Sequence, residues 1–290
     1  MAAAVAVAPR RPSRTAVLTA AGRAMHREEP PPLVLDDPLA LQLAGDDGIV
    51  LIERLRAELP SQGLLSFSRW VCVRARLPED IVERAVADGV GQYVILGAGL
   101  DSFAYRRGDL VDELRIFEVD HPASQVWKRL RLDEIGVGVP RNLVFAPVDF
   151  ERETLREGLE AAGFDFTAPA VFSWIGVTMY LSLNAITRTL TTVAECPAGT
   201  RIVLTYNRPQ SALQGLGLAL NSAIAKIATE MDEPFVSSFE PAEIEKLLRR
   251  LGFDEISHFG PEEAIRTYFA GQDDVQFGGN QRLVVATVSH

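Results

Sequence analysis

Cysteine and histidine are scarce in this chain of 290 residues. Only two cysteines occur, Cys72 and Cys196, and they have no paired spacing. A disulfide framework or a zinc knuckle needs several cysteines at fixed intervals, so neither is indicated. The four histidines also lack the spacing of metal ligands. We therefore expect no metal in the site.

Long apolar runs and an excess of basic residues are missing as well. No stretch approaches the roughly 20 apolar residues that a membrane-spanning helix needs. The apolar run at residues 16–21 is shorter than the roughly 7–15 residues of a signal-peptide core. The formal net charge is -10, whereas a general nucleic-acid binder normally has a basic surface. These absences predict a cytoplasmic protein that binds neither nucleic acid nor membrane.

Three familiar sequence signatures are incomplete. A dinucleotide fingerprint needs a third glycine three residues after Gly99, but Ser102 stands there. A P-loop needs Gly-Lys before Ser or Thr, and none of the three lysines follows a glycine. The Gly-x-Ser-x-Gly motif of α/β-hydrolases does not occur. NAD and ATP hydrolysis are therefore disfavoured, and a nicotinamide-dependent oxidoreductase and a non-catalytic cofactor-binding protein are kept as alternatives.

The sequence does contain a regular alternation of strand-like and helix-like segments. Its length and its 47% hydrophobic content fit one large α/β domain. Strands separated by crossover helices predict a mostly parallel sheet, and the ending QFGGNQRLVVATV indicates a hairpin-like pair with an antiparallel last strand. The seven predicted strands are residues 92–96, 114–119, 143–148, 170–174, 201–206, 255–259 and 282–289.

Helical segments precede and interrupt this core. The first ends at EEPPP because prolines cannot continue a helix, and the next are bounded by Asp-Pro, Leu-Pro and Gly signals. One domain is expected, with five parts: residues 1–12 disordered, 13–90 an N-terminal helical cap, 91–207 a cofactor-binding core, 208–240 a helical insertion or lid, and 241–290 a final helix and strands.

The first predicted strand runs into a glycine loop, QYVILGAGLDSFAYR. Gly97 and Gly99 permit a tight turn in which the backbone approaches a ligand, and a helix beginning after the turn would offer free N–H groups. Ligands of open parallel sheets bind beyond the carboxyl ends of the strands, where the strand order reverses. The other ends carry FEVDH, PVDF, SWIGVTMY and TYNR. We therefore expect a nucleotide-like ligand at this edge.

Acids at the ends of the second and third strands are candidates to hold that ligand. Asp120 lies about 20 residues beyond the glycines, where a carboxylate accepts hydrogen bonds from ribose hydroxyls. Glu118 falls on the same face of the strand and is its rival. Asp149 and Phe150 suit an adenine pocket, and the alternative is that Asp149 caps a helix beginning near Glu151.

His121, in the turn before a proline, has a possible role as a base, and we interpret it as structural. S-adenosylmethionine contains adenine and ribose but no pyrophosphate. Among nucleotide-like ligands it therefore fits the remaining features best.

Taken together, QYVILGAGLDSFAYR, FEVDHPASQVWKRLRL, VDF and WIGVTMYLS resemble the leucine carboxyl methyltransferase family, over about residues 14–207. The resemblance implies a Rossmann-like class I methyltransferase fold and S-adenosylmethionine as cofactor, and we expect a small-molecule acceptor. It also implies an arginine that pairs with the cofactor's methionine carboxylate, for which Arg74 in VRAR is the better match and Arg76 the second. The cofactor-binding residues expected are Arg74, Gly97, Ala98, Gly99, Asp101, Glu118, Asp120, Asp149 and Phe150.

The sequence departs from the family after the fourth strand. Members that methylate a protein C-terminus tend to carry Glu-Gly there, whereas Ile175-Gly176 is similar to the bacterial branch. No side chain stands out as a base, and a carboxylate acceptor is already ionised at neutral pH. We therefore expect O-methylation of a carboxylate or an acidic hydroxyl, positioned by Tyr180, Tyr206 or Arg208.

Overall fold

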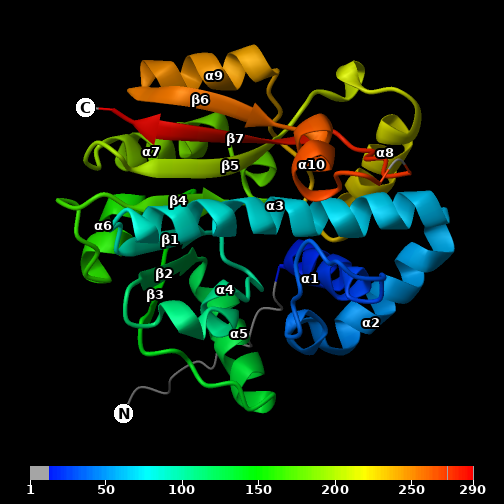
Figure 1. Cartoon of the computed structure of the whole chain (residues 1–290), viewed down its shortest axis with the longest axis horizontal. Coiled ribbons are helices and arrows are strands. Elements are labelled where there is room, and N and C mark those ends of the chain that lie inside the picture. Colours follow the sequence, from blue (N-terminus) through cyan, green and yellow to red (C-terminus); the bar gives the residue numbers. More distant parts are fainter. Residues whose placement is uncertain (1–12, 273, 290) are drawn as a thin grey trace, which may run out of the picture.

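A single sheet of seven strands organises the chain in the computed structural model, which describes residues 13–272 and 274–289 (Figure 1). The expected disorder of residues 1–12 lies outside the described residues. The strands are β1 (Gln92–Leu96), β2 (Arg115–Asp120), β3 (Leu143–Pro147), β4 (Val171–Trp174), β5 (Arg201–Asn207), β6 (Phe253–Phe259) and β7 (Gln281–Val288).

The sheet order is β3-β2-β1-β4-β5-β7-β6. The strands from β3 to β5 pair in parallel, and β7 pairs antiparallel with both β5 and β6. Because β1 pairs with β2 on one side and β4 on the other, the strand order reverses there, where ligands bind in open sheets. The predicted Rossmann-like α/β fold with an antiparallel C-terminal strand is confirmed.

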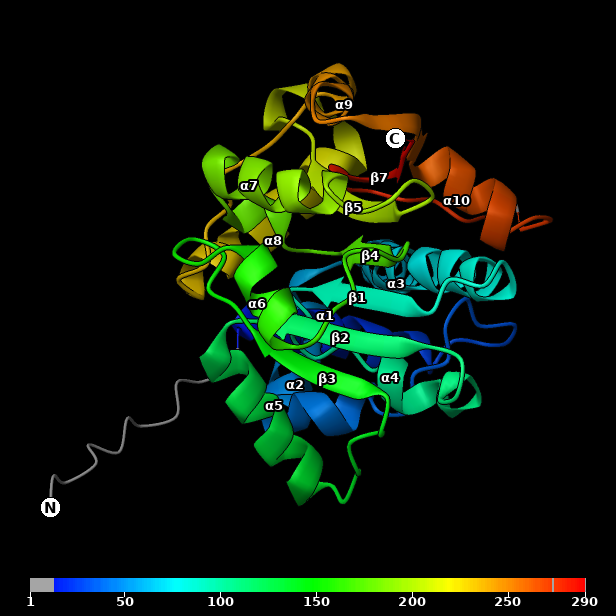
Figure 2. The same ribbon diagram turned by 90° about the vertical axis from the view of Figure 1, so that its left-hand side faces the viewer.

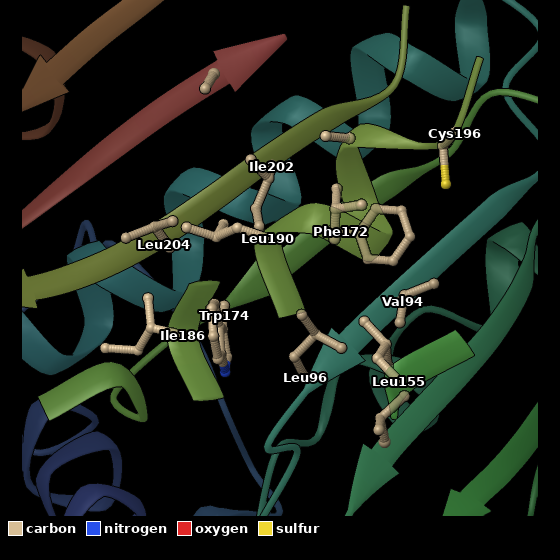
Figure 3. Close-up of a cluster of buried hydrophobic side chains, with 14 of the residues drawn as sticks. Val94, Leu96, Leu155, Phe172, Trp174, Ile186, Leu190, Cys196, Ile202 and Leu204 are labelled. Atoms are coloured by element: carbon tan, nitrogen blue, oxygen red, sulfur yellow. The ribbon is translucent and has the colours of Figure 1, made fainter. Parts of the chain in front are cut away.

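Helices cover both faces of the sheet (Figures 1 and 2). Tyr93 and Ile95 of β1 pack into one buried cluster with α3, whereas Val94 and Leu96 pack into another with α6 and α7. Burial on both faces explains the continuous apolar run of this strand. Figure 3 shows Trp174 of β4 inside the second cluster. The helices between strands are α4 (Phe103–Arg106), α5 (Pro122–Glu134), α6 (Leu155–Ala161), α7 (Leu183–Ala194), α8 (Gly215–Glu230), α9 (Pro241–Arg250) and α10 (Pro261–Tyr268).

The predicted N-terminal helical cap is confirmed as α1 (Arg14–His26), α2 (Ala40–Glu58) and α3 (Ser61–Ala87). The expected boundary at Leu-Pro is wrong at Pro78, because α3 continues through it. Leu77 and Ile81 on either side are buried against the sheet, and this packing offsets the lost backbone hydrogen bond. A third buried cluster joins α1 to α8, so the 208–240 segment packs on the cap.

The C-terminal part differs in one respect from the expected hairpin-like pair. Strands β6 and β7 do pair antiparallel, but α10 and a loop connect them in place of a tight turn. The sequence interpretation missed α10, although Pro261 at its first position and the acids Glu262 and Glu263 in its first turn are helix-start signals. Strand β6 begins at Phe253, two residues before the predicted start.

Candidate functional site

A cavity of about 360 Å³ lies at the carboxyl ends of the central strands, between the sheet edge and the helical cap. Residues from α1, α3, the loops after β1 to β4 and the loop after α8 form its walls. The predicted site residues that line it are Arg74, Gly97, Ala98, Gly99, Asp101, Asp120, Asp149, Phe150 and Tyr180. The structure thus brings together residues that span more than 100 positions of the sequence.

Three predicted site residues lie elsewhere. Glu118 is buried against Lys128, with 2.7 Å between Oε2 and Nζ. Tyr206 is fully buried, and its hydroxyl is 3.0 Å from Nδ1 of His258. Arg208 lies 3.5 Å from the Glu240 carboxylate, and it does not line the cavity. The structure therefore gives neither Tyr206 nor Arg208 access to a ligand there.

The glycine loop after β1 is confined on two sides. Gly97 (φ 64°) and Gly99 (φ 46°) adopt left-handed backbone conformations that disfavour side chains. A Cβ on Gly97 would lie 2.4 Å from Cγ2 of Val177, and one on Gly99 would lie 3.0 Å from Cβ of Ala16. The glycines therefore allow the loop to fit between the turn after β4 and helix α1.

Asp120 connects this loop to the end of β2. Its Oδ2 accepts a hydrogen bond from the Gly99 nitrogen at 2.5 Å, and its Oδ1 accepts one from the His121 nitrogen at 2.6 Å. Burial raises the pKa of Asp120, although these two hydrogen bonds oppose the shift. His121 accepts from the Ala123 nitrogen through Nδ1, and so caps the start of α5, in keeping with a structural role.

The loop after β3 contributes Asp149 and Phe150. Asp149 accepts a hydrogen bond from the Glu151 nitrogen at 3.1 Å, which is a local turn. The alternative, that Asp149 caps a helix beginning near Glu151, is wrong, because α6 begins at Leu155 and Thr154 caps it. Phe150 packs against Trp174 with ring centroids 6.1 Å apart. An apolar ring and a carboxylate thus adjoin each other at this end of the cavity.

Arg74 of α3 is a buried cation with a neutral partner. One guanidinium nitrogen donates to Oε1 of Gln281 at 2.7 Å, and burial lowers the pKa of Arg74 to about 10. Across residues 13–272 and 274–289, Arg74 forms no ion pair. Gly176 lies beside it, where a Cβ would be 3.4 Å from the guanidinium. The site therefore holds a positive charge that a ligand anion can reach. Arg76, the second match, instead pairs with Asp80 at 2.6 Å.

The cap supplies cavity residues that the sequence interpretation missed. Phe67 and Val71 line the cavity together with Arg74, and their spacing of four and then three residues places them on one face of α3. Arg23 of α1 also lines it and is held by the buried Asp37 at 2.8 Å. Ser102 donates to the same Asp37 at 2.7 Å. Helical spacing from Arg74 was the one signal that could have identified Phe67 and Val71.

A single carboxylate fastens the cap to the segment after α8. Glu233 accepts hydrogen bonds at 3.0 Å from the Ser13 hydroxyl and from the Arg14 nitrogen, and it also accepts from the Thr15 hydroxyl. Nearby, the rings of Tyr180 and Phe235 lie 5.5 Å apart. Burial raises the pKa of Tyr180, so its hydroxyl is neutral at physiological pH. These contacts close one side of the cavity.

Within residues 13–272 and 274–289, no three His, Cys, Asp or Glu side chains cluster in a way that could hold a metal ion. In the same ranges, no helix is both long enough and apolar enough to cross a bilayer.

Comparisons with known proteins converge on one group. The sequence model described as "Leucine carboxyl methyltransferase" matches residues 16–194. A Bacillus subtilis strain 168 protein named "Putative S-adenosyl-L-methionine-dependent methyltransferase YktD" is 29% identical over 284 residues, covering 90% of this chain and 93% of its own length. A Mycobacterium avium strain 104 protein of the same description is 35% identical over 191 residues, covering 66% and 63%. Among solved structures, a DUF574 family protein from Streptomyces avermitilis matches with a TM-score of 0.56 and 15% identity, covering 84% of this chain and 91% of its own.

Proposed function

The chain belongs to the leucine carboxyl methyltransferase family, and we propose that it methylates an oxygen of a small molecule, either a carboxylate or an acidic hydroxyl. It is an S-adenosylmethionine-dependent methyltransferase. The proposal concerns the acceptor and the residues that hold each reactant.

Hydrogen-bonding groups around the cavity can be assigned to each part of S-adenosylmethionine. Asp120 at the end of β2 would hold the ribose hydroxyls, and Asp149 with Phe150 would hold the adenine. The backbone of the glycine loop lines the cavity, where it would contact the ligand directly. Arg74 would take the methionine carboxylate at the far end. The polar groups of the cavity thus match the sequence of groups along the cofactor.

The observation that carries the proposal is the isolated charge of Arg74. A buried cation without a counterion is costly, and a bound carboxylate removes that cost through two parallel hydrogen bonds. Gln281 offers a neutral oxygen that orients the guanidinium but does not neutralise it. The arrangement is that of an anion site whose anion belongs to the ligand.

Beyond Arg74 the cavity is lined mainly by apolar side chains and hydroxyls. Phe67 and Val71 of α3, Ile224 of α8 and Phe235 face it, together with the Tyr180 ring. The total volume of about 360 Å³ is near the lower end of the roughly 300–1,000 Å³ typical of small-molecule sites. Because the same volume also has to hold the cofactor, little space is left for the acceptor, which supports a small molecule over a protein chain end.

When bound, S-adenosylmethionine supplies a methyl group that its positive sulfur makes electrophilic. The protein then has to align the acceptor oxygen with that methyl group and exclude water, and alignment alone is worth roughly 7–11 kcal/mol of barrier in well-oriented systems. The neutral Tyr180 hydroxyl can donate a hydrogen bond that orients an anionic oxygen. No general base is required if the acceptor is already ionised.

Two measurements test the proposal. Calorimetry with S-adenosylmethionine, its demethylated product and NADH should show binding of the first two and none of NADH. Transfer of labelled methyl from S-adenosylmethionine to a panel of carboxylic acids and phenols should then give oxygen-methylated products. Mild base releases the label as methanol from a methyl ester but not from an aryl ether, which identifies the oxygen. Label found only on nitrogen, carbon or sulfur acceptors would refute O-methylation.

A further inference from the structure

Lys128 of α5 lies underneath the glycine loop and outside the cavity lining. It is one of three lysines in the chain, and its side chain is 2% exposed. Its Nζ donates a hydrogen bond to the main-chain oxygen of Asp101 at 2.7 Å and another to Oε2 of Glu118 at 2.7 Å. Asp101 lines the cavity, whereas Lys128 and Glu118 do not. The ammonium group therefore joins the end of the glycine loop to the middle of β2 from inside the protein.

Stability of the fold gives a weak reason for this buried pair. The free-energy cost of removing two charges from water often exceeds the gain from their attraction, and a pair of apolar side chains of similar volume can stabilise the fold equally well. Burial raises the pKa of Glu118 to about 7, even though Lys128 opposes the shift. In the described part of the chain, Oε1 of Glu118 has no hydrogen-bond partner. Unlike an apolar replacement, the Lys128 ammonium group donates a hydrogen bond to the Asp101 carbonyl.

The loop needs such a donor at its far end. Its first half is fixed by hydrogen bonds from the Gly97 and Ala98 nitrogens to the Val119 oxygen, at 2.7 and 3.1 Å. Gly99 is held by Asp120. At Asp101, the last residue of the loop, the main-chain carbonyl accepts a hydrogen bond from Lys128. The Asp101 side chain accepts another from the Phe103 nitrogen at 2.8 Å, at the start of the short helix α4. Lys128 thus completes a set of contacts that runs the length of the loop.

We propose that Lys128 is a positioning residue for cofactor binding, which fixes the Asp101 carbonyl and so holds residues 97–101 in the conformation that receives the ligand. The inference rests on the proposed binding of S-adenosylmethionine at this loop. Other contacts hold the glycines, and Arg23 donates to the Leu100 oxygen at 2.7 Å, so loss of the Lys128 contact would loosen the loop at Asp101. The ligand would then have to order this end of the loop, at the expense of affinity.

The test separates the tether from the ion pair. Glu118→Gln keeps the Lys128 ammonium on the Asp101 oxygen and leaves an amide oxygen as its second acceptor, but it removes the counterion, and the stability measurement reports that cost. The double variant Glu118→Gln/Lys128→Met removes both charges, so no unpaired ion is buried, and also removes the tether. Calorimetry measures the dissociation constant of S-adenosylmethionine for each, and thermal unfolding measures their stability. Hydrogen exchange at the amides of residues 99–103 reports loop order without any ligand.

The single variant should bind S-adenosylmethionine within about threefold of the parent, whereas the double variant should bind about 10-fold or more weakly, the scale of a lost charge-assisted hydrogen bond. Loop amides should exchange faster in the double variant only. Parent-like affinity and exchange in a folded double variant would overturn the proposal, and so would equal losses in both variants. If the double variant does not fold, Glu118→Gln/Lys128→Gln, which keeps polar groups at both positions but removes the ammonium group from the Asp101 oxygen, replaces it under the same criteria. If the parent itself fails to bind S-adenosylmethionine, the proposed function is wrong, and hydrogen exchange still tests Lys128.

Discussion

The side chain of Asp120 and the backbone of Gly99 are joined by a hydrogen bond of 2.5 Å between Oδ2 and the amide nitrogen. Since Asp120 also lines the cavity, one carboxylate both shapes the glycine loop and faces the ligand. Its loss should therefore affect every ligand that contains the ribose.

Asp120→Asn should weaken S-adenosylmethionine and adenosine by similar factors, about 10- to 100-fold, or roughly 1–3 kcal/mol per lost hydrogen bond to a charged group. Titration calorimetry on both ligands measures this. Asp112→Asn is the matched control, because that carboxylate is exposed and far from the cavity lining. Unchanged adenosine affinity in the Asp120 variant would contradict the assignment of the ribose to this carboxylate.

Arg74→Lys should weaken S-adenosylmethionine and its demethylated product by about 10-fold each and leave adenosine unaffected, because a lysine cannot supply two parallel donors to a carboxylate. Arg76→Lys provides the control, since Arg76 is two positions away on α3 and pairs with Asp80. Calorimetry on the three ligands measures the pattern. Equal losses that include adenosine would indicate damage to the cap in place of a lost carboxylate contact.

Gly97→Ala should destabilise the fold by about 1–3 kcal/mol, because the new Cβ would meet Val177 and the backbone there is left-handed. Urea unfolding gives the free energy. Adding Val177→Ala should restore part of the loss, leaving the strain of the backbone. Gly108→Ala, where no atom lies within 4 Å of the Cβ position, should cost less than 1 kcal/mol, roughly the scale of a surface change. No rescue by the second substitution would mean that crowding against Val177 is not the cause.

Glu233→Ala should loosen the first turn of α1 without unfolding the sheet, because it removes the acceptor of four hydrogen bonds at that end. Hydrogen exchange of residues 15–19 should rise about 10-fold, the equivalent of one lost charge-assisted contact. Glu230→Ala is the control, because Glu230 is the last residue of α8 and forms an exposed pair with Arg54 of α2. Equal exchange in parent and Glu233→Ala would show that the cap is held by packing alone.

The Glu118–Lys128 pair should make stability depend on pH in a defined direction. Burial raises the pKa of Glu118 from 4.5 to about 7 in the folded protein. A raised folded pKa means that the carboxyl group contributes most stability below pH 4.5 and that this contribution is lost as the pH rises through about 7.

Between pH 4.5 and pH 8, the free energy of unfolding of the parent should therefore fall by about 1–3 kcal/mol relative to that of Glu118→Gln/Lys128→Met. Urea unfolding of both proteins at several pH values measures the difference, and taking the difference cancels groups that the two share. If the parent instead becomes more stable than the double variant as the pH rises, the raised pKa of Glu118 is contradicted.

The central strands and the glycine loop were predictable because local chemistry determines them. The continuous apolar run of β1 needs burial on both faces, and the two glycines of its loop need left-handed backbone. Alternation also correctly placed Glu118 and Asp120 on one face of β2. Two residues of strand span roughly 7 Å, however, so Glu118 lies deeper in the sheet, where Lys128 reaches it and the cavity does not.

The part of the site around Arg74 depends on contacts between distant segments, which local sequence patterns do not predict. The family resemblance indicated Arg74, but its neighbours Arg23 and Phe235 come from a helix and a loop at distant points of the chain. Tyr206 is the last residue of the expected strand, yet its side chain is buried in the cluster that includes α6 and α7, and its hydroxyl meets His258 of β6. The direction in which Tyr206 points depends on how β5 pairs with β7. The β7 residues of that pairing lie about 80 positions later in the chain.

The cavity is assembled from both extremes of the chain: Arg74 hydrogen-bonds to Gln281, 207 residues later, and Glu233 holds the first turn of α1, 218 to 220 residues earlier. During synthesis the sheet from β1 to β5 can form while the remaining segments are still unmade. The cofactor has no complete pocket until β7 has left the ribosome and paired with β5. S-adenosylmethionine can therefore protect the finished chain against proteolysis but not the growing one, and a truncated product would be left without that protection.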